Sequence, residues 1–434
     1  MNLEEIKSIV VAQREEIREK IERQRIIDRE ADKNRMRQYL SAPNILIISG
    51  MRRCGKSVFS RQILEGVPHG YLNFDDERLI DFSAKDFEKL MQAFYELYGD
   101  IEYIVLDEPQ NIEGWELFVS RLRTTKRIII TGSNSKLLSG ELASRLTGRY
   151  INFVLFPFSF REFLRYHNFT FEARDLHYTK KVAEIKRYLE DYIREGGLPE
   201  VYLFGRDLTI QIFSDILERD IISRLGIKKR AAFKELAKYL ISNSSSEITF
   251  SKLGNILGIK DVNTIKNWID GMEAAFLVKI VSRYSPKLKE HFIAPRKVYC
   301  NDLGIVNTIG FKISKNIGKL MENLVAIELF RRKSYYRQEW EIFYWKNHQQ
   351  KEVDFVIKDG ENILQLIQTT YASDTKEIEK REIDDLVRAS SELKCNDLLI
   401  ITHDCSDEII ADGKKIRLIP LWKWLITPPP LSPR

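Results

Sequence analysis

The stretch ISGMRRCGKSVFSRQIL, residues 48–64, decides the fold that the sequence predicts. Within it, Gly50 to Ser57 spell G-x-x-x-x-G-K-S, the spacing of a phosphate-binding loop. A short apolar run, NILIISG, comes before the motif and a helical segment, SVFSRQIL, comes after it, as the motif requires. Because glycines let backbone N–H groups wrap a phosphate at a helix N-terminus, the stretch predicts a nucleotide site.

Residue chemistry predicts the roles inside this loop. Lys56 is expected to reach the β- and γ-phosphates of the nucleotide, and Ser57 is expected to bind Mg²⁺. The alternative, a glycine-rich turn with an incidental lysine, is disfavoured by the flanking strand and helix. The expected nucleotide contacts lie in the loop and the first helical turn: Gly50, Arg53, Cys54, Gly55, Lys56, Ser57 and Val58.

Two acids follow another apolar run, in YIVLDEPQNIEGW. Asp107 and Glu108 come at the end of the predicted strand. We expect Asp107 to hold the magnesium ion, directly or through water, and Glu108 to orient and polarise the attacking water as general base. Acids at a strand end can also cap a turn, but that alternative is weak after a complete phosphate loop.

A third apolar run ends in polar residues, in IIITGSNSKLLS. Thr131, Ser133 and Asn134 come at this strand end. A polar side chain there can lie near the γ-phosphate and the water. Asn134 is the predicted residue and Ser133 the next choice, while the alternative is an ordinary strand-to-loop turn.

Two arginines follow this strand, in ELASRLTGRY. Arg145 and Arg149 have the i, i+4 spacing of one helix face. An arginine delivered to a neighbouring subunit's γ-phosphate stabilises transition-state charge, and Arg149 is favoured over Arg145 for this role. The role implies a homo-oligomer; the alternative is that both are ordinary surface arginines.

Composition sets broad limits. The 434 residues favour two or three domains, and 69 basic against 63 acidic residues give a net charge of +6, which permits nucleic-acid contact without requiring it. Four cysteines form no C-x-x-C pair, so a reducing cytoplasm is the expected setting, without a zinc site. The N-terminus does not resemble a secretory signal, and no apolar run approaches the roughly 18 residues of a membrane span.

The rest of the chain divides by pattern. Residues 3–40 are expected to form one charged helix, either a solvated arm, a helix packed on the next domain, or an arm for oligomerisation or nucleic acid. Alternating short apolar runs and helical stretches after residue 44 predict an α/β fold with a parallel sheet. Three amphipathic helices and a hairpin in residues 231–300 fit a winged-helix unit, which can bind DNA or only proteins.

These stretches together resemble a large prokaryotic family of AAA-type ATPases, abundant in archaea. The matching segments include GMRRCGKS, VLDEPQNIEGWE, TGSNSKLLSGELASRLTGRY, PFSFREFL, EGGLPEVY, DLGI and GKLMENLVAIEL. The resemblance implies ATP as the nucleotide. It also implies a C-terminal domain similar to PD-(D/E)-x-K nucleases.

The nuclease resemblance is incomplete in this sequence. Glu322 matches the helix acid of that family and Asp354 matches the strand acid. Gln368 and Thr370 stand where a further acid and a lysine are needed to hold a metal and activate water. The fold is therefore expected without its chemistry, with Glu352 as a substitute ligand being the main risk to this expectation.

The sequence as a whole predicts an Mg²⁺-dependent AAA-type ATPase that remodels or regulates a DNA-associated partner. A nucleotide-dependent protein switch without DNA binding is the first alternative, and an ATP-dependent nuclease is the second. The expected domains are a charged helical arm (1–40), a P-loop ATPase core (41–155), a helical lid region (156–230), a winged-helix-like domain (231–312) and a degenerate nuclease-like domain with a loose Pro-rich tail (313–434).

Overall fold

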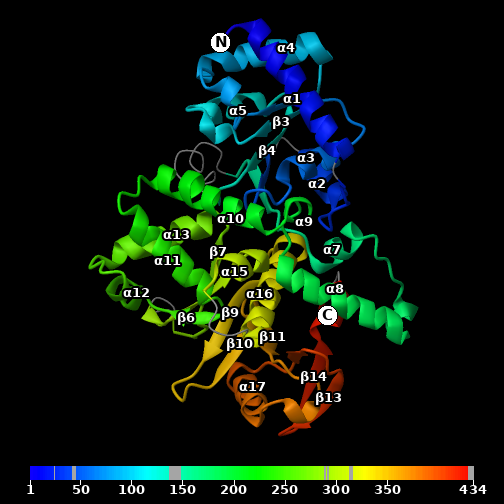
Figure 1. Ribbon diagram of the computed structural model, residues 1–434, viewed down its shortest axis with the longest axis vertical. Coiled ribbons are helices and arrows are strands. Elements are labelled where there is room, and N and C mark those ends of the chain that lie inside the picture. Colours follow the sequence, from blue (N-terminus) through cyan, green and yellow to red (C-terminus); the bar gives the residue numbers. More distant parts are fainter. Residues whose placement is uncertain are drawn as a thin grey trace. The chain divides into compact units, whose positions relative to one another are not determined.

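A computed structural model describes most of the chain (Figure 1). The chain divides into two compact units, the first made of Met1–Phe156 with Ala274–Phe276 and the second of Pro157–Glu273 with Leu277–Arg434. Each unit is described by itself. The described residues are 1–23, 25–41, 45–135, 148–287, 290, 293–311 and 316–428.

The first unit is built on a parallel sheet in the strand order β2-β3-β4-β1-β5. Its central strands β1, β3 and β4 are almost continuously apolar and buried, as expected for strands covered on both faces. The expected α/β fold with a parallel sheet is confirmed for this unit. The strands are β1 Ile45–Ser49, β2 His69–Asn73, β3 Tyr103–Asp107, β4 Arg127–Gly132 and β5 Tyr150–Val154.

Helices cover this sheet. The longer ones are α1 Leu3–Arg23, α2 Lys33–Ser41, α3 Lys56–Ile63, α4 Phe87–Tyr98 and α5 Trp115–Leu122, with 3₁₀ turns at η1 Glu77–Leu79, η2 Ala84–Asp86 and η3 Pro109–Asn111. The prediction of one helix over residues 3–40 is wrong, because Asp32 accepts hydrogen bonds from the backbone N–H groups of Asn34 and Arg35 and so caps a second helix.

The two N-terminal helices belong to the core of the first unit. Ile6, Ile9 and Val10 of α1 are buried in its main apolar cluster, which also contains residues of β1, β3 and α4. In α2, Met36 and Leu40 are buried. Of the alternatives for this segment, the structure supports a helical segment packed on the core.

The second unit begins with helices: α7 Phe160–Tyr166, η5 Ala173–His177, α8 Thr179–Glu195, α9 Val201–Phe204, α10 Arg206–Asp215 and the π-helical η6 Ile216–Ser223. The chain enters it through a buried cluster of hydrogen bonds. Phe158 N donates to Gly197 O at 2.6 Å, Gly197 N donates to the Asp302 carboxylate at 2.6 Å, and Arg331 donates to the carbonyls of Pro157 and Phe158 at 3.2 Å each. Motifs far apart in the sequence thus meet at one point.

A small helix-and-sheet module follows. Its elements are α11 Arg230–Ser242, β6 Ser246–Ile248, α12 Phe250–Ile256, α13 Val262–Ala274, β7 Val278–Ser282 and β8 Arg296–Cys300. The three strands form an antiparallel sheet in the order β6-β8-β7. Leu236, Leu253 and Ile265, one from each helix, are fully or almost fully buried, which makes the module well packed.

The C-terminal part holds a mixed sheet in the order β13-β14-β12-β11-β10-β9. Helices α16 and α17 both contact β11, an inner strand of this sheet (Figure 1). The elements are α15 Leu303–Ile309, α16 Ile317–Tyr336, β9 Glu341–Lys346, β10 Glu352–Asp359, β11 Asn362–Thr369, η7 Thr375–Glu377, α17 Lys380–Leu393, β12 Leu398–Thr402, β13 Asp407–Ala411, β14 Lys414–Pro420 and α18 Leu421–Ile426.

Two expectations concern the chain outside these elements. The end of the tail expected to be loose, residues 429–434, lies outside the described residues. Within the described ranges, no helix combines the length and the apolar character needed to cross a bilayer.

Candidate nucleotide-binding site

The phosphate loop runs from the end of β1 to the start of α3, and two of its glycines are required by geometry. A Cβ atom on Gly50 would lie 2.3 Å from the carbonyl oxygen of Leu155, a distance that no side chain tolerates. Gly55 has φ of 98°, in the left-handed region that favours glycine. The loop can therefore pass close to the neighbouring backbone and turn sharply into the helix.

The N-terminus of α3 is suited to an anion. Gly55 is its N-cap residue and provides no side-chain hydrogen bond to the first-turn N–H groups. Such groups carry the positive end of the helix dipole and bind phosphates. The Lys56 ammonium lies inside the loop, 3.2 Å from the Met51 carbonyl oxygen and 4.0 Å from a Glu108 carboxylate oxygen, and its side chain is 6% exposed. The first-turn N–H groups of α3 and the Lys56 ammonium therefore lie together at the phosphate loop, where they can attract an anion.

Asp107 is held by hydroxyl groups at the end of β3. Tyr71 donates a 2.9 Å hydrogen bond to one carboxylate oxygen, and Thr131 donates to the other. The Ser57 hydroxyl in turn hydrogen-bonds the Tyr71 oxygen. Burial and the neighbouring Asp107 hold the pKa of Tyr71 well above its usual 10.0, so the phenol remains a donor. Ser57 and Asp107, the two predicted magnesium ligands, thus both interact with one tyrosine hydroxyl.

This arrangement fits a hydrated magnesium ion beside the loop. Carboxylate and hydroxyl oxygens are the hard ligands that Mg²⁺ prefers, and the ion usually keeps several waters. An aspartate whose two oxygens are each fixed by one donor is rotationally ordered, yet retains lone pairs toward the loop. Ser57 and Asp107 would hold the ion, which would neutralise phosphate charge when it is bound.

Glu108 adopts an unusual backbone conformation. Its φ of 53° is left-handed, which is rare for a residue with a long side chain. Its N–H donates to the Thr131 carbonyl at 3.0 Å, and its carboxylate accepts hydrogen bonds from Gln110 and, at 3.3 Å, from Ser133. Strain of this kind persists where surrounding contacts over-determine it, commonly at functional sites. In this conformation one carboxylate oxygen lies 4.0 Å from the Lys56 ammonium.

The N-terminal segment contributes a residue to the loop that the sequence did not reveal. Arg29, between α1 and α2, is 8% exposed and donates to the Cys54 carbonyl at 2.9 Å and to the Phe156 carbonyl at 2.6 Å. A Cβ atom on Gly55 would lie 3.3 Å from this guanidinium. Arg29 therefore fixes the outer side of the loop. Tyr71, in the middle of β2, and Gln110, shortly after the end of β3, were also missed, because neither belongs to a recognisable motif.

The remaining predicted residues divide into those near the loop and those away from it. Cys54 is buried, with its thiol 3.4 Å from the Leu155 carbonyl oxygen, and burial raises its pKa. Arg53 is exposed and Val58 is half-buried in the first turn of α3. Asn134 is buried directly after Ser133, at the same sheet edge as Asp107.

Of the two arginines predicted to act on a neighbour, only Arg149 lies among the described residues. Arg149 is exposed and precedes β5, with its carbonyl accepting from Ile45 N at the start of β1. It therefore lies at the sheet edge opposite the loop. Arg145 lies outside the described residues.

In the second unit, the structure brings Glu322 and Asp354 together, but with a lysine between them. Lys297 of β8 makes ion pairs with both carboxylates. The Gln368 side-chain oxygen accepts from Asp354 N at 3.3 Å, and Thr370 N donates to the Ile401 carbonyl at 3.0 Å. A search of the described residues finds no group of three or more His, Cys, Asp and Glu residues arranged to hold a metal.

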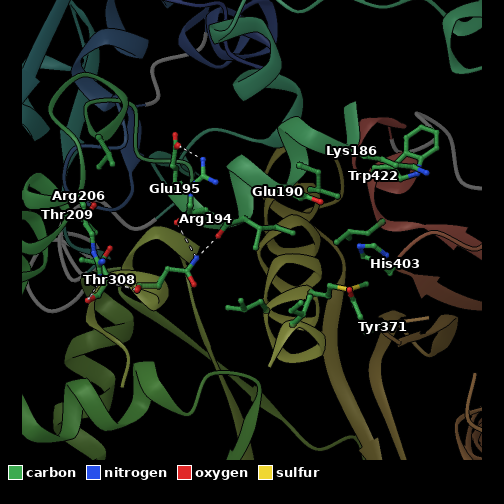
Figure 2. Close-up of a pocket in the computed structure, with 18 of the residues that line it drawn as sticks. Lys186, Glu190, Arg194, Glu195, Arg206, Thr209, Thr308, Tyr371, His403 and Trp422 are labelled. Atoms are coloured by element: carbon green, nitrogen blue, oxygen red, sulfur yellow. Dashed lines mark hydrogen bonds and ion pairs between the residues drawn. The ribbon is translucent and has the colours of Figure 1, made fainter. Parts of the chain in front are cut away.

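The second unit also contains a cavity of about 840 Å³ (Figure 2). Tyr371, His403 and Trp422 lie toward one end of it, and Arg206 and Thr308 lie toward the other. Trp422 donates to Asp404 at 3.3 Å, and Asp404 also pairs with Lys186. Its lining is mostly apolar with charges of both signs, and it contains none of the residues predicted from the sequence.

The sheet, the loop and the acids at the carboxyl edge define an AAA-type P-loop domain. In agreement, residues 42–164 match the family described as an AAA domain. Two domains of unknown function match the remainder: DUF8612 over residues 186–316 and DUF4143 over residues 317–424.

The sequence is 35% identical to the uncharacterized protein MJ1544 of Methanocaldococcus jannaschii, covering 89% of each chain. It is 30% identical to an uncharacterized protein of Haemophilus influenzae, covering 92% of this chain and 99% of that one. The protein belongs to the family of these two relatives. Among solved structures, the Walker-type ATPase PABY2304 of Pyrococcus abyssi matches with 15% identity and a TM-score of 0.41, over 65% of this chain and 96% of that chain.

Proposed function

We propose that the protein binds ATP with Mg²⁺ and hydrolyses it to ADP and phosphate. The observation that carries the proposal is the arrangement of Lys56 and Glu108, whose ammonium and carboxylate lie 4.0 Å apart at the mouth of an uncapped helix. An ammonium there attracts phosphate, and a carboxylate there can orient water toward it. The hydroxyl network on Asp107 supports the magnesium assignment.

The roles follow from these positions. Lys56 and the loop N–H groups bind the β- and γ-phosphates, and Ser57 and Asp107 hold the cation. Glu108 accepts a hydrogen bond from the attacking water and directs its oxygen at the γ-phosphorus, in line with the leaving β-phosphate oxygen. Ser133, which already contacts Glu108, and the adjacent Asn134 orient the water and the γ-phosphate from the end of β4.

The decisive experiment is Glu108→Gln in the full-length protein. The change keeps the shape of the side chain but removes the base, so ATP should still bind while hydrolysis falls by about 10²–10⁴-fold. Glu113→Gln, an exposed acid five residues further on, is the matched control and should hydrolyse ATP at the parent rate. Unchanged turnover in Glu108→Gln would show that the base lies elsewhere.

We further propose that the chains assemble and that Arg149 acts on a neighbour's ATP. Its exposure and its place at the sheet edge opposite the loop are compatible with action on another subunit and not on its own site. Hydrolysis per chain should then rise with protein concentration. Mixing Arg149→Ala chains with Lys56→Ala chains should restore activity, because an intact Arg149 can meet an intact Lys56. An absence of rescue, with rates independent of concentration, would contradict this assignment.

The work driven by hydrolysis is proposed to be remodelling or regulation of a DNA-associated partner in the cytoplasm. The order α11-β6-α12-α13-β7-β8 supports a winged-helix interpretation of the module. Asn263 and Lys266 of α13 are exposed and available to a ligand. Acidic residues on the same helix, such as Asp270, leave a DNA-independent protein switch as the alternative.

Binding of duplex DNA across a salt series, with and without ATP, separates these two functions. DNA binding should weaken steeply as salt rises, because lysines release counterions from phosphates. Lys266→Glu should weaken binding, while Lys394→Glu, an exposed lysine on the C-terminal domain, should not. Equal binding by both variants would favour the protein switch.

A further inference from the structure

The cavity in the second unit has one end that suits an anion. The start of α10 forms this end, and its N-cap residue, Gly205, has no side chain to bind the first-turn N–H groups. Gly205 has φ of 76°, and a Cβ atom placed on it would meet no other part of the described chain within 4 Å. The helix N-terminus, which carries the positive end of the helix dipole, therefore faces open space.

Arg206, the first residue of α10, lies at the same end of the cavity (Figure 2). Its guanidinium lies 3.5 Å from the carbonyl oxygen of Asn307 and 3.4 Å from that of Thr308, and no carboxylate among the described residues pairs with it. A guanidinium has five N–H donors, and long contacts to two neutral acceptors leave most of them unused. This arginine is therefore available to an anion.

Thr209, one turn further along α10, is a buried polar residue without a partner. The residue is 1% exposed and lines the cavity beside Arg206 (Figure 2). Its hydroxyl makes no hydrogen bond to any residue that the structure describes. Buried polar groups are normally hydrogen-bonded, so an exception calls for an explanation. A ligand in the cavity would supply the missing partner.

The remaining lining suits an apolar body. Its apolar side chains come mainly from two helices: Leu189 and Ile193 of α8, and Leu320 and Met321 of α16. Tyr371, His403 and Trp422 lie toward the end opposite Arg206 (Figure 2). The rings of Tyr371 and His403 are 4.6 Å apart, and Tyr371 is exposed, which leaves part of its ring available to a ligand. A cavity of about 840 Å³ has the size of sites that hold small organic molecules.

The other charged groups of the lining do not oppose an anion at this end. Four of them form two ion pairs, Lys186 with Asp404 and Arg194 with Glu195. Glu190 is exposed and lies away from Arg206 (Figure 2). Asp207, in the first turn of α10, is exposed and does not line the cavity. Among the described lysines and arginines of the lining, Arg206 is therefore the one without a carboxylate partner.

We propose that this cavity binds a small organic anion, with its carboxylate or phosphate group at the N-terminus of α10 and its apolar body directed toward Tyr371 and Trp422. Arg206 pairs with the anionic group, and the first-turn N–H groups and the Thr209 hydroxyl donate hydrogen bonds to it. The apolar lining removes the body of the ligand from water. The site belongs to the second unit and does not rest on the ATP hydrolysis proposed for the first.

The test is the binding of 2-naphthyl phosphate and of 2-naphthoate to the full-length protein, measured by titration calorimetry. Each probe joins an anionic group to an apolar double ring. One molecule per chain should bind with a Kd of about 1 mM or below, the range for ligands of this size. The probe that binds more tightly identifies the anionic group. Both titrations are repeated with Lys56→Ala, because binding that persists there does not occur at the phosphate loop.

Two variants and a control locate the bound anion. Arg206→Met should raise the Kd of the tighter probe by at least about tenfold, the usual effect of losing a hydrogen bond to a charged group. Thr209→Val, which removes only the hydroxyl, should raise it by about 2–12-fold and leave the melting temperature unchanged or higher. Arg219→Met, at an exposed position of η6 outside the lining, is the matched control and should leave the Kd unchanged.

A neutral ligand separates an anion site from a merely apolar cavity. At neutral pH, 2-naphthol has the same double ring without the anionic group. It should bind the parent protein more weakly than the tighter anion, and bind the parent and Arg206→Met equally. The proposal is overturned if neither anion binds, if binding is lost in Lys56→Ala, or if 2-naphthol binds as tightly as the anions. It is also overturned if folded Arg206→Met and Thr209→Val bind the anions as the parent protein does.

Discussion

Lys56 and Lys297 are both buried lysines beside acids, one in each unit, but their surroundings differ. The Lys56 ammonium lies 3.2 Å from a backbone carbonyl and 4.0 Å from Glu108, in a loop that begins and ends with glycine, at Gly50 and Gly55. The Lys297 ammonium lies within 3.0 Å of three carboxylates. The first is placed to receive a further anion, whereas the second is already saturated with anions. The partners of a lysine, more than its burial, separate a ligand-binding role from a structural one.

The largest expected effect is the loss of stability when Lys297, the lysine surrounded by carboxylates, is replaced. Lys297→Met leaves uncompensated carboxylates in the interior, so the free energy of unfolding should fall by about 3–5 kcal/mol. ATP hydrolysis per folded chain should not change, since Lys297 is outside the nucleotide site. Urea unfolding at pH 8, with hydrolysis measured on the same samples, provides the comparison. Loss of hydrolysis at unchanged stability would reverse the roles assigned to the two lysines.

The stability difference between the parent protein and Lys297→Met should also depend on pH. Burial lowers the pKa of Lys297, but the surrounding carboxylates and Tyr299 together raise it well above 10.5. A raised folded-state pKa stabilises the protein fully below the unfolded value and ceases to do so as pH rises through the folded value. Loss of Lys297 also removes a cation that lowers the pKa of Glu322, which is about 7 in the parent protein. The stability difference between the parent and Lys297→Met should therefore be largest from about pH 8 to about pH 10, and shrink both below that range, as the acids are protonated, and above it, as Lys297 is deprotonated.

The next effect is on catalysis at the loop lysine. Lys56→Ala removes the charge that faces the phosphates, so kcat/KM for ATP should fall by about 10²–10³-fold, equivalent to roughly 2.7–4 kcal/mol. Thermal unfolding should be almost unchanged, because this ammonium has a carbonyl and one distant carboxylate as partners. A folded Lys56→Ala protein that turns over ATP at the parent rate would remove the basis for the site.

A smaller effect is expected at Arg29, which supports the loop from outside. Arg29→Met leaves the carbonyls of Cys54 and Phe156 without this donor, so the free energy of unfolding should fall by about 1.5–3 kcal/mol. ATP should also bind more weakly, because the loop is less ordered. Arg18→Met, at an exposed position on α1, is the control and should change neither quantity. Equal behaviour of the two variants would show that the N-terminal segment is independent of the loop.

No effect on nucleic acid is expected from the acidic cluster. With Lys297 between Glu322 and Asp354, and with Gln368 in place of an acid, plasmid, linear and single-stranded DNA should remain intact in Mg²⁺ or Mn²⁺, with or without ATP. Agarose gels after prolonged incubation are sufficient. Cleavage that disappears in Asp354→Ala would make the protein an ATP-dependent nuclease.

The sequence predicted the parts of this molecule that depend on short-range patterns. Lys56 lies in an eight-residue motif and Asp107 follows an apolar strand, so both could be recognised locally. The alternation of short apolar runs with helical stretches predicted the parallel sheet around them. The same reasoning failed at the N-terminus, where one helix was expected, because α1 ends at Arg23 and Asp32 caps a separate helix, α2.

Long-range contacts account for what could not be predicted. Lys297 is 25 residues from Glu322 and 57 from Asp354 in sequence, and it lies in a segment that predicted only a hairpin. Arg29 reaches the loop from a charged stretch that looked solvated. Nothing in the spacing of these residues distinguishes them from other basic residues, so only the folded chain identifies them.

The left-handed backbone of Glu108 has a consequence for how this protein can change over time. A non-glycine residue in that conformation costs about 1–2 kcal/mol relative to glycine. Glu108→Gly is therefore expected to unfold at a higher temperature than the parent protein while losing hydrolysis. Under the role proposed for Glu108, selection for folding alone favours glycine at this position, whereas selection for hydrolysis favours glutamate. A stability-enriched library of variants should accumulate glycine at position 108 when hydrolysis is not selected, and retain glutamate when it is.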